Sequence, residues 1–595
     1  MCAIFGMIGG HETHKAFQAF ELLSHRGADD KVIFEDGETF LGLHRLAITA
    51  VDQDTSSYYR EDHRTILFNG EIYNYQSLAE TLNISVSSEI ALLHAAYEHW
   101  GDDFVHHLRG MFAIAIIEKE EVKLFRDPFG KKPLFYALDE DRFIFASEMK
   151  AIHAVLPWHF EKQKIPTYFS FQTVLAPCTF DRNIFQVNAG EMVRFSRIDK
   201  ELSCHVYDQL LEEKGVVHSD EDAVENLEKA LLESISLRIP QEVTFGCLLS
   251  GGVDSSLVSA MVAKHQKIDT FSLGYEGYEK YDERPFAQTV ATHLGTRHHE
   301  ILLKKEDFFH TVDEVVALLD EPIADPAMVP LYFLMQAVKK KGFKVVLTGD
   351  GSDELFMGYR AYKEFYALEG LKSFQFKGWM QHYLKTHFSM HKEWEWHKRV
   401  FEESLLFRSS AELFTDLQQN RLLRMNIKDN HSVEALQQHR ATFERSQRTS
   451  PIDWYSFLDL KVTLGDLFLR KLDRMSMAHG VEARSPFLDK EVVKIAFACA
   501  PEVRMGKTSK HLVKQVAEKY LPQEIVYRKK KGFNYPYIEW LYEGDELELI
   551  DRVQEKMQLF HPEELAYYIN KGKQGKFKQH IFAIYILCKW LEKHL

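Results

Sequence analysis

The sequence predicts a chain of at least two domains, the second of which has an α/β fold with a doubly wound parallel sheet. The 595 residues are too many for one hydrophobic core. In the second half, short apolar runs alternate with segments of helical spacing, the pattern of a parallel sheet covered by helices on both faces. A glycine-bearing loop, residues 250–256, follows the first of these strands. Ligands bind at such loops, beyond the carboxyl ends of parallel strands.

The elements of the second half can be placed in order from their periodicity. Strands are expected at residues 243–249, 268–273, 299–303 and 344–347, and helices at 221–237, 255–264, 283–294, 306–319 and 329–341. Residues 362–450 are rich in aromatic residues and in histidine. Because the histidine spacing is irregular, this stretch indicates a helical extension rather than a metal site.

Composition and charge exclude several classes of partner. The formal net charge is -15 and the isoelectric point is near 6.0, which argues against binding to nucleic acid or to an anionic membrane. The six cysteines are scattered without a C-x-x-C pair, as in a protein of the reducing cytosol. No basic segment opens the chain as in a signal peptide, and the apolar run at 581–587 is too short to span a bilayer. We expect a cytoplasmic protein, and the sequence leaves open whether it forms a homodimer.

The loop Ser250-Gly251-Gly252-Val253-Asp254-Ser255-Ser256 has the features of a phosphate-binding turn. Two glycines let the backbone N–H groups turn inward, and Ser255 and Ser256 supply hydroxyls where a helix begins. The positive end of the helix dipole favours an anion there. The loop lacks the lysine of the G-x-x-x-x-G-K-[ST] motif. It resembles instead the pyrophosphate loop of N-type ATP pyrophosphatases.

An acidic loop follows the last predicted strand of this series. It reads Thr348-Gly349-Asp350-Gly351-Ser352-Asp353-Glu354, and its three carboxylates would repel one another without a cation. Asp254 is expected at the same edge of the sheet. Oxygen ligands beside phosphate are typical of Mg²⁺ sites. A solvated acidic turn is the alternative, but the turn follows a buried strand that ends near a nucleotide loop.

Cys2 is the candidate nucleophile of the first half. Loss of Met1 would leave its α-amino group, with a pKa of about 8, as a general base for its own thiol. A small buried apolar residue would be the simpler interpretation of position 2 alone. Ordered motifs follow, however, at residues 24–30, 44–48 and 68–74. Together with Cys2-Ala3-Ile4-Phe5-Gly6, they resemble class II glutamine amidotransferase domains over roughly residues 1–195.

This resemblance implies an αββα sandwich of two antiparallel sheets with an N-terminal nucleophile. Short alternating stretches agree with it, at residues 31–34, 65–68, 113–117, 122–126 and 143–146. It also implies roles for single residues. Cys2 would attack the glutamine amide, and Asn69 with the Gly70 N–H would form the oxyanion hole. Arg45 would bind the α-carboxylate of glutamine, and Glu71 would help to hold its amino group. Ser87 would also lie at this amino group, at a position where the family has an aspartate that pairs with the ammonium.

Further stretches extend the likeness along nearly the whole chain. They are residues 127–136, 145–150, 319–326, 471–478 and 482–489. With Cys2 and the pyrophosphate loop, they resemble the glutamine-hydrolysing asparagine synthetases. The family uses ATP, aspartate and glutamine, with adenylation of the aspartate side chain and transfer of ammonia through the protein. Residues 127–132 are expected to form a turn at the interface between the domains.

The resemblance also implies residues of the synthetase site. Residues matched to ATP binding are Leu249, Ser250, Gly251, Gly252, Asp254, Ser255, Leu273, Thr348 and Gly349. Asp254 and Asp353 would bind Mg²⁺, and Asp350 matches a position tied to formation of the acyl-adenylate. Lys510 matches a lysine that stabilises charge at the reacting centre, although a solvated helix lysine is an almost equal alternative.

The polar stretch at residues 200–207 is the predicted boundary between the domains. We expect a glutaminase domain over residues 1–200 and an ATP-dependent synthetase domain over residues 208–595. Two alternatives remain at this point. The enzyme could amidate another carboxylate, on a sugar or a peptide, or the chain could be a binding protein whose catalytic sites have decayed.

We predict that Ser87→Asp lowers the KM for glutamine. A carboxylate would pair with the substrate ammonium, whereas the serine hydroxyl carries no charge. A charge-assisted hydrogen bond exceeds a neutral one by about 1 kcal/mol, or roughly fivefold to tenfold in affinity. Steady-state kinetics with glutamine measure the change, and synthesis from free ammonia serves as the control that stays constant. A KM that is flat or higher would mean that Glu71 or Glu89 already binds the ammonium.

Overall fold

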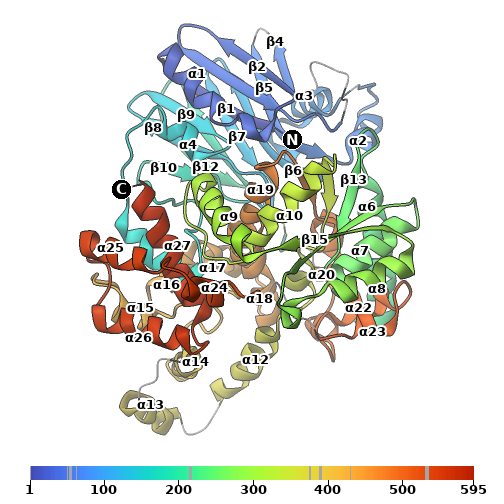
Figure 1. Ribbon diagram of the computed structural model, residues 1–595. Helices are drawn as coiled ribbons and strands as arrows, with labels where there is room; N and C mark the ends of the chain where they lie inside the picture. The colour runs from blue at the N-terminus through green and yellow to red at the C-terminus, as the bar shows by residue number, and fades with distance from the viewer. Residues whose placement is uncertain are drawn as a thin grey trace.

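The computed structural model describes residues 2–49, 51, 57–61, 63–86, 88–208, 210–212, 217–373, 377–387, 391–428, 430–529 and 535–594. Ser87 lies outside these residues, so the expectation for it stays a prediction. In Figure 1 the N-terminal strands lie at the top and the C-terminal sheet and helices lie below them. The chain ends far from Cys2, on helix α27.

The N-terminal part is a sandwich of two antiparallel sheets, as predicted. The first sheet has the order β10-β8-β9-β1-β3-β2 and the second β12-β11-β7-β6-β5-β4. The strands are β1 Cys2–Ile8, β2 Asp30–Glu35, β3 Thr39–Arg45, β4 Tyr58–Glu61, β5 Arg64–Ile72, β6 Gly110–Glu118, β7 Glu121–Arg126, β8 Phe135–Asp139, β9 Arg142–Ala146, β10 Ile184–Gln186, β11 Glu191–Ser196 and β12 Leu202–Val206. Helices α1 Thr13–Glu21 and α4 Met149–His153 cover the first sheet, and α2 Tyr75–Thr81 and α3 Glu89–Trp100 cover the second.

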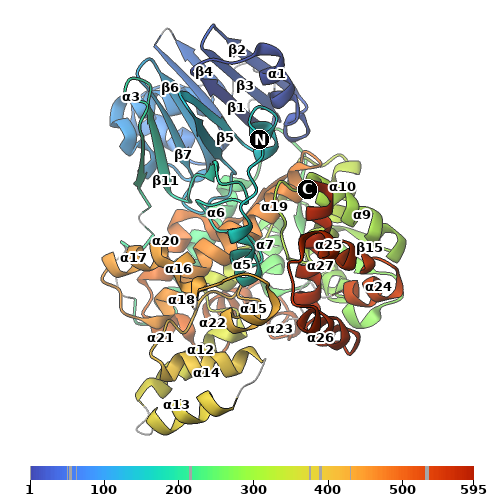
Figure 2. The same cartoon turned by 90° about the vertical axis from the view of Figure 1, so that its left-hand side faces the viewer.

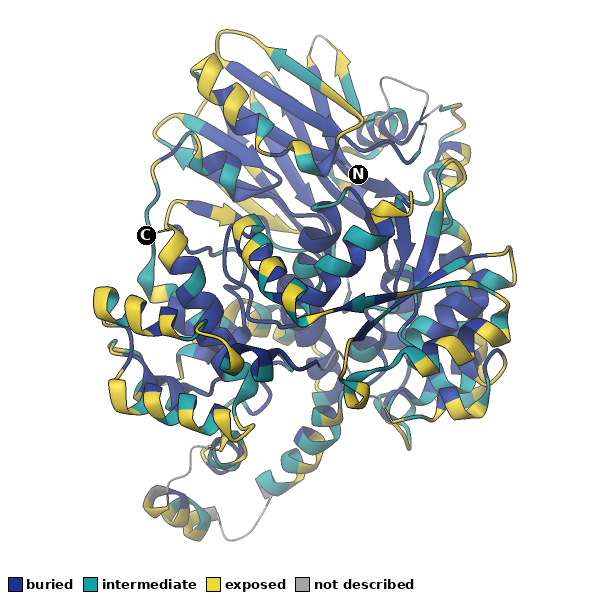
Figure 3. Ribbon diagram, viewed as in Figure 1, coloured by how far each residue is buried: buried dark blue, intermediate teal, exposed yellow. Residues whose placement is uncertain are grey.

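Strand β1 is buried on both of its faces, and this fixes the position of Cys2. Its residues alternate between two hydrophobic clusters: Cys2 and Ile4 face the second sheet, while Ala3 and Phe5 face α1 and α4. Every residue of the strand is buried, as Figure 3 shows in dark blue. The nucleophile is therefore held at the start of an internal strand between the sheets.

The C-terminal part contains a five-stranded parallel sheet of order β15-β14-β13-β16-β17. Its strands are β13 Phe245–Leu248, β14 Asp269–Tyr275, β15 Arg297–Leu303, β16 Val345–Leu347 and β17 Glu482–Arg484. Strands β13 to β16 confirm the prediction from periodicity. Strand β17 was not predicted, because it is three residues long and two of them are charged. All neighbouring strands are parallel, so their carboxyl ends share one edge.

Helices cover the parallel sheet in two groups, as expected for a doubly wound fold. Helix α7 contacts α6 and α8, whereas α10 contacts α9 and α19. These helices are α6 Asp220–Arg238, α7 Val253–Ala263, α8 Arg284–Leu294, α9 Lys305–Leu318, α10 Met328–Lys340 and α19 Arg470–Met477. No helix within the described residues is long and apolar enough to cross a membrane.

The region of residues 362–450 is helical, as predicted, and adds a lobe below the sheet. Its helices are α12 Arg360–Glu369, α13 Lys377–Thr386, α14 Lys392–Phe401, α15 Asp416–Leu422, α16 His431–Ala435 and α17 Gln437–Arg445. In Figure 1, α13 projects away from the body of the molecule. The described residues contain no group of three or more His, Cys, Asp or Glu side chains placed to hold a metal ion.

Helices near the C-terminus complete the lower part. They are α11 Ser352–Leu355, α18 Pro451–Asp459, α20 Lys490–Ala498, α21 Pro501–Met505, α22 His511–Ala517, α23 Gln523–Val526, α24 Tyr537–Glu543, α25 Glu548–Met557, α26 Pro562–Lys573 and α27 Lys578–His594. Helix α5, Ile165–Phe171, lies among them although it precedes them by hundreds of residues (Figure 2). The Tyr168 hydroxyl donates to the Ala583 carbonyl at 2.9 Å. Strand β12 pairs with β11 just before residue 208. The division into domains of residues 1–200 and 208–595 stays a proposal.

A buried cluster of charged side chains joins the two parts of the chain. Arg26 contacts Glu148 and Asp473, each at 2.8 Å. Arg474 in turn contacts Glu148 and Asp320, the latter at 2.6 Å. All five side chains are buried. Burial alone would raise the pKa of Glu148, but Arg474, Lys150 and His25 lower it well below its ordinary value.

Lys131 is a second buried cation at this interface. It lies in the predicted turn at residues 127–132, whose N–H groups donate to the Asp127 carboxylate. Lys131 and Lys132 are both buried rather than solvated. Lys132 contacts Asp473, whereas the Lys131 ammonium donates to the Ser485 hydroxyl at 3.0 Å. Burial and the positive charges of Lys132 and Arg238 lower the pKa of Lys131 to about 7. The negative charges of Asp350 and Glu482 act in the opposite direction but are weaker.

We predict that Arg474→Met lowers the free energy of unfolding by about 3–5 kcal/mol, because it removes a buried cation that the carboxylates of Glu148 and Asp320 share. Urea unfolding of the full chain followed by tryptophan fluorescence measures the change. Arg182→Met is the matched control. Arg182 is exposed, and its Nε lies 3.9 Å from Oε2 of Glu161. Equal unfolding midpoints for the two variants would contradict the structural role of Arg474.

We predict that Lys131→Met stabilises the protein at pH 7 more than at pH 10. Between about pH 7 and its ordinary pKa of 10.5, this lysine is neutral when folded and protonated when unfolded. The unfolded state therefore binds the additional proton, and wild-type stability is lost as the pH falls through this window. The loss is of the order of 4 kcal/mol when complete, at pH 7 and below.

Urea midpoints of wild type and Lys131→Met, measured from pH 6.5 to pH 10, test this expectation. The gap between the two proteins should be widest at pH 6.5 and should close towards pH 10. Lys119→Met removes an exposed lysine of the same part of the chain and is the control. A gap that does not depend on pH would show that Lys131 is charged throughout.

Candidate active sites

Cys2 and the Asn69 side chain meet between the two sheets. The backbone nitrogen of Cys2 donates to Asn69 Oδ1 at 3.1 Å, and the Cys2 thiol contacts the Ser57 hydroxyl at 3.4 Å. Asn69 is fully buried, and its Nδ2 has no acceptor among the described residues. A buried donor of this kind is suited to an oxyanion that forms during reaction.

The Asn69-Gly70 pair lies inside strand β5 rather than in a hairpin turn, which would have been the simplest interpretation of the two residues alone. Gly70 pairs with Phe112 of β6. A Cβ on Gly70 would lie 2.1 Å from the Met111 carbonyl oxygen, so this close approach of two strands requires glycine. The strand thereby brings Asn69 beside Cys2 and Glu71 beyond it.

Arg45 and Glu71 complete the predicted glutamine site. Arg45 is the direct cross-strand partner of Cys2 on β3. Thr49 connects the two charged residues, since its carbonyl accepts from Arg45 at 3.4 Å and its hydroxyl donates to Glu71 at 3.0 Å. Glu71 also contacts Arg484 at 3.2 Å. This last contact could not be predicted from local patterns, because Arg484 is more than four hundred residues away in the chain.

Glu89 lies close to this site but is not suited to replace a missing charge. It is buried at the start of α3, and its carboxylate accepts from the Ile72 N–H. Burial and the nearby charge of Glu71 raise the pKa of Glu89 well above its ordinary value. The Glu89 carboxylate is thus already bound to the Ile72 N–H, and the neighbouring Glu71 disfavours its charged form.

The loop at residues 250–256 forms the predicted turn between β13 and α7. Gly251 has φ of +69° and packs against Ala287, a conformation and a contact that favour glycine. Ser250 and Ser255 are hydrogen-bonded to each other through their hydroxyls at 3.1 Å. Gly252 is the N-cap of α7, so Asp254 and Ser255 lie in its first turn. The N–H groups of that turn are oriented towards the edge of the sheet.

The acidic loop and the pyrophosphate loop contact each other directly. A Cβ on Gly349 would lie 2.8 Å from both Asp254 Cβ and the Ser255 nitrogen, so glycine allows the two loops to pack together. Ser352 donates to Asp254 at 2.6 Å. The Lys510 ammonium contacts Asp254 and Asp353, the latter at 2.8 Å. Lys510 is therefore a buried ion-pair residue and not the solvated helix lysine of the alternative interpretation.

The two carboxylates that converge on Lys510 fit the predicted Mg²⁺ site. Magnesium in nucleotide sites takes one or two protein carboxylates, and phosphate and water supply its other ligands. Asp254 and Asp353 reach one point from two loops, which matches this donor set. Lys510 has φ of +56°, a strained value for a residue other than glycine. A Cβ on Gly358 would overlap Asp353 and Lys510, so Gly358 leaves room for both.

A cavity of about 640 Å³, here called the main cavity, opens at this edge of the parallel sheet. It is lined by almost all the residues predicted to bind ATP: Leu249, Ser250, Gly252, Asp254, Ser255, Leu273, Thr348 and Gly349. Gly251 is not among its lining residues. Asp350, Asp353 and Lys510 line the same cavity. Glu354, whose pKa is raised to about 8 by burial and by Asp353, also borders it.

Several residues of the main cavity were assigned no individual role from the sequence. Arg528 binds the pyrophosphate loop through the Gly251 carbonyl at 2.6 Å and contacts Glu283 at 2.7 Å. It begins the basic stretch at residues 528–532, of which residues 530–532 lie outside the described residues. Lys471 and Asp325 also line the cavity and form an ion pair. The sequence analysis identified the segments 319–326 and 471–478 that contain them, but it did not predict that these two side chains pair with each other.

The glutamine site and the main cavity are joined by a short series of contacts. Arg484 contacts Glu71 through its side chain, and its carbonyl accepts from the Thr348 N–H at 2.8 Å. The next residue, Ser485, is hydrogen-bonded to the Thr348 hydroxyl at 3.0 Å and accepts from Lys131. Strand β17 therefore contacts both candidate sites.

Comparison with known families and proteins agrees with this arrangement. The family model described as asparagine synthase matches residues 226–592, and the model described as glutamine amidotransferase domain matches residues 1–208. Asparagine synthetase [glutamine-hydrolyzing] 1 of Bacillus subtilis is 30% identical over 564 residues, covering 91% of this chain and 88% of the relative. Asparagine synthetase B [glutamine-hydrolyzing] of Escherichia coli is 26% identical over 599 residues, covering 94% and 88%.

The asparagine synthase model spans more than half of the chain, and the two matched regions correspond to the two candidate sites. The similarity to these relatives extends across both regions. The chain therefore belongs to the asparagine synthase family, whose members carry out glutamine-dependent amidation with ATP.

Proposed function

We propose that this chain converts aspartate to asparagine, using Mg²⁺, ATP and ammonia released from glutamine. The observation that carries the proposal is the main cavity, where the pyrophosphate loop, the acidic loop and Lys510 meet. The relatives named above are asparagine synthetases, which supports aspartate as the acceptor. We assign to the site residues the roles that the family resemblance implies.

In the first site, the Cys2 thiol would attack the amide carbon of glutamine. Arg45 would bind the α-carboxylate and Glu71 the amino group. Asn69 Nδ2 and the Gly70 N–H would donate to the oxyanion, and the free Nδ2 donor beside Cys2 supports this role. Ammonia leaves as the thioester forms, and water then releases glutamate and restores the thiol.

In the second site, the N–H groups and hydroxyls of the pyrophosphate loop would bind the phosphate end of ATP. Asp254 and Asp353 would hold Mg²⁺, which neutralises phosphate charge when bound. Lys510 would donate to the oxygens that gain charge during adenylation. Asp350 lies on the same loop, where it can orient the acceptor. Ammonia then displaces AMP from the adenylated carboxylate.

A second candidate is an acceptor larger than aspartate, with the same chemistry at both sites. The observation in its favour is the extent of the cavity beyond the nucleotide loops. Asp325 and Phe468 line the main cavity and also a neighbouring one, so the space next to the acceptor continues. An acidic sugar or a peptide carboxylate would use this additional space.

A coupled assay with aspartate, glutamine and ATP, recording asparagine and pyrophosphate, tests the proposal. We predict that Cys2→Ala lowers glutamine-dependent synthesis by at least about 10³-fold, because the nucleophile is lost, and leaves ammonia-dependent synthesis within about twofold of wild type. Pyrophosphate release with other acids but not with aspartate would favour the larger acceptor. Loss of both activities in folded Cys2→Ala would refute the division into two sites.

We predict that Asp254→Asn lowers Mg²⁺-dependent pyrophosphate release by about 10²-fold or more, since the variant removes one of two metal-binding charges. Glutamate release from glutamine should stay within about twofold, because Cys2 and Arg45 lie in the other site. Asp313→Asn, which alters an exposed carboxylate on α9, is the control. An unchanged rate of pyrophosphate release would remove Asp254 from the metal site.

A further inference from the structure

A second cavity, here called the side cavity, lies next to the main cavity and has a volume of about 310 Å³. Its wall combines segments that are far apart in the sequence: the end of α5, the loop before α15, and the starts of α14 and α27. It is lined by Gln172, Asp325, Lys392, Ser410, Glu412 and His580, together with neighbouring residues of the same segments. Asp325 and Phe468 line both cavities.

The charged groups of the side cavity are two ammonium groups and two carboxylates. Three of them already have partners: Lys578 contacts Glu539 at 2.8 Å, Asp325 contacts Lys471, and Glu412 contacts Arg399 at 2.6 Å. Lys392 has no ion pair with any described residue, although its ammonium lies 5.2 Å from the centre of the Trp396 ring. One positive charge of the wall is therefore uncompensated.

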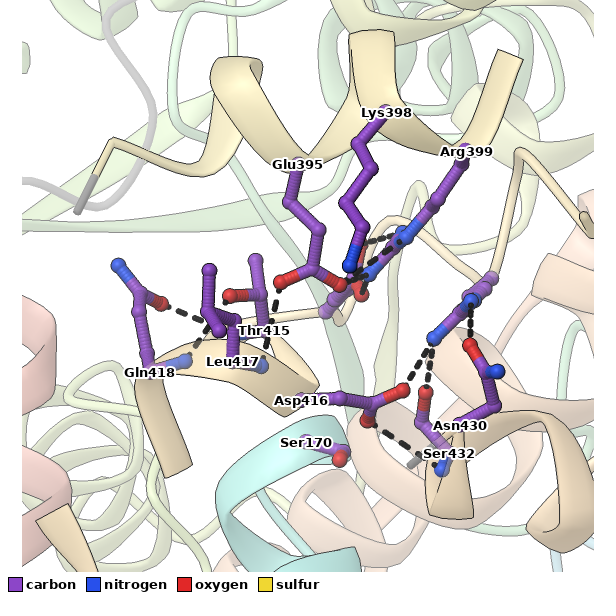
Figure 4. Close-up of polar contacts among 12 residues, drawn as sticks. Ser170, Glu395, Lys398, Arg399, Thr415, Asp416, Leu417, Gln418, Asn430 and Ser432 are labelled. Carbon is purple, nitrogen blue, oxygen red and sulfur yellow. Dashed lines mark hydrogen bonds and ion pairs between the residues drawn. The ribbon is translucent and has the colours of Figure 1, made fainter. Parts of the chain in front are cut away.

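Another group of charged side chains at the wall has one negative charge in excess. Figure 4 shows Arg399 between two carboxylates. They belong to Glu395 and Glu412, at 2.7 Å and 2.6 Å, so one guanidinium serves two anions. A carboxylate can accept about four hydrogen bonds, so Glu412 retains capacity for another donor. The neighbouring Arg408 does not supply the missing charge, because it pairs with Asp416.

The remaining lining groups are neutral and polar. Gln579 donates to Gln172 at 2.9 Å, which holds the two amides against each other. Burial and the charge of Lys392 lower the pKa of His580 to about 3, so its ring is neutral. His580 Nε2 is buried and has no hydrogen-bond partner among the described residues. The lining of the cavity thus includes charges of both signs and neutral hydrogen-bonding groups.

From this arrangement we propose that the side cavity binds a free α-amino acid with a polar side chain, as its zwitterion. Its carboxylate pairs with Lys392, its ammonium group with Glu412, and its side chain with His580 and the glutamine amides. A ligand of one charge would leave either Lys392 or the Glu395–Glu412 pair uncompensated. Because Asp325 and Phe468 belong to both cavities, the bound amino acid contacts the wall of the synthetase site.

Calorimetric titration of the full chain, without ATP or glutamine, tests the proposal directly. The probes are L-serine and L-asparagine, with propionate and propylamine as probes of a single charge. We expect the amino acids to bind at least tenfold more tightly than either singly charged probe. Lys392→Met should weaken their binding by about tenfold, the effect of losing one charge-assisted hydrogen bond. Lys392→Arg should restore it to within threefold.

Two controls separate this site from the catalytic ones. Lys571→Met removes a lysine with a similar ring contact, to Tyr567, outside the cavity and should leave binding unchanged. Cys2→Ala and Asp254→Asn should also bind the probes as wild type does. The proposal fails if a singly charged probe binds as tightly as the amino acids, if Lys392→Met binds like wild type, or if either catalytic variant abolishes binding.

Kinetics with Lys392→Met then assign the source of the amino acid. A higher KM for the acceptor with an unchanged kcat means that the acceptor itself extends into the side cavity. An unchanged KM means that a separate amino acid occupies it. The first result would overturn a site for a separate amino acid, whereas the second agrees with it. The titration requires no turnover, so it does not depend on whether aspartate is the acceptor.

Discussion

Compensation of buried charge between the N-terminal sandwich and the C-terminal sheet is the constraint on which the rest of this structure depends. Arg26 and Glu148 from one side meet Asp473 and Arg474 from the other, and all of them are buried. Removing any one member leaves a charge in a medium of low dielectric constant, so the two parts of the chain are stable together in one arrangement. That arrangement sets the distance between Cys2 and the main cavity.

The same constraint brings the two candidate sites into contact through strand β17. Arg484 holds Glu71 in one site and accepts from the Thr348 N–H in the other, so a shift of this strand alters both. The contact is physical rather than a proof of coupling, which would require two states of β17. Lys131, from the turn at 127–132, lies beside this strand and donates to Ser485 at the edge of the parallel sheet.

The synthetase site shows where local geometry has been adjusted to its contacts. Lys510 adopts a left-handed conformation, and its ammonium lies between Asp254 and Asp353. Gly349 and Gly358 leave space that any side chain would fill. Strain of this kind persists where surrounding contacts determine it, and it occurs often at ligand sites.

The sequence by itself determined the fold class and most of the main cavity. Short apolar runs identified β13 to β16, because strands of a parallel sheet are buried on both faces. Helical spacing identified the helices between them, because each buries one face. The glycine loops identified the ligand edge for the same local reason. Tertiary structure alone decided the contacts of Arg484 with Glu71, of Lys510 with Asp353, and of Lys392 with the side cavity. These join residues from distant segments, and no local pattern records which charged side chains meet, since pairing depends on how the layers pack and which groups are buried together.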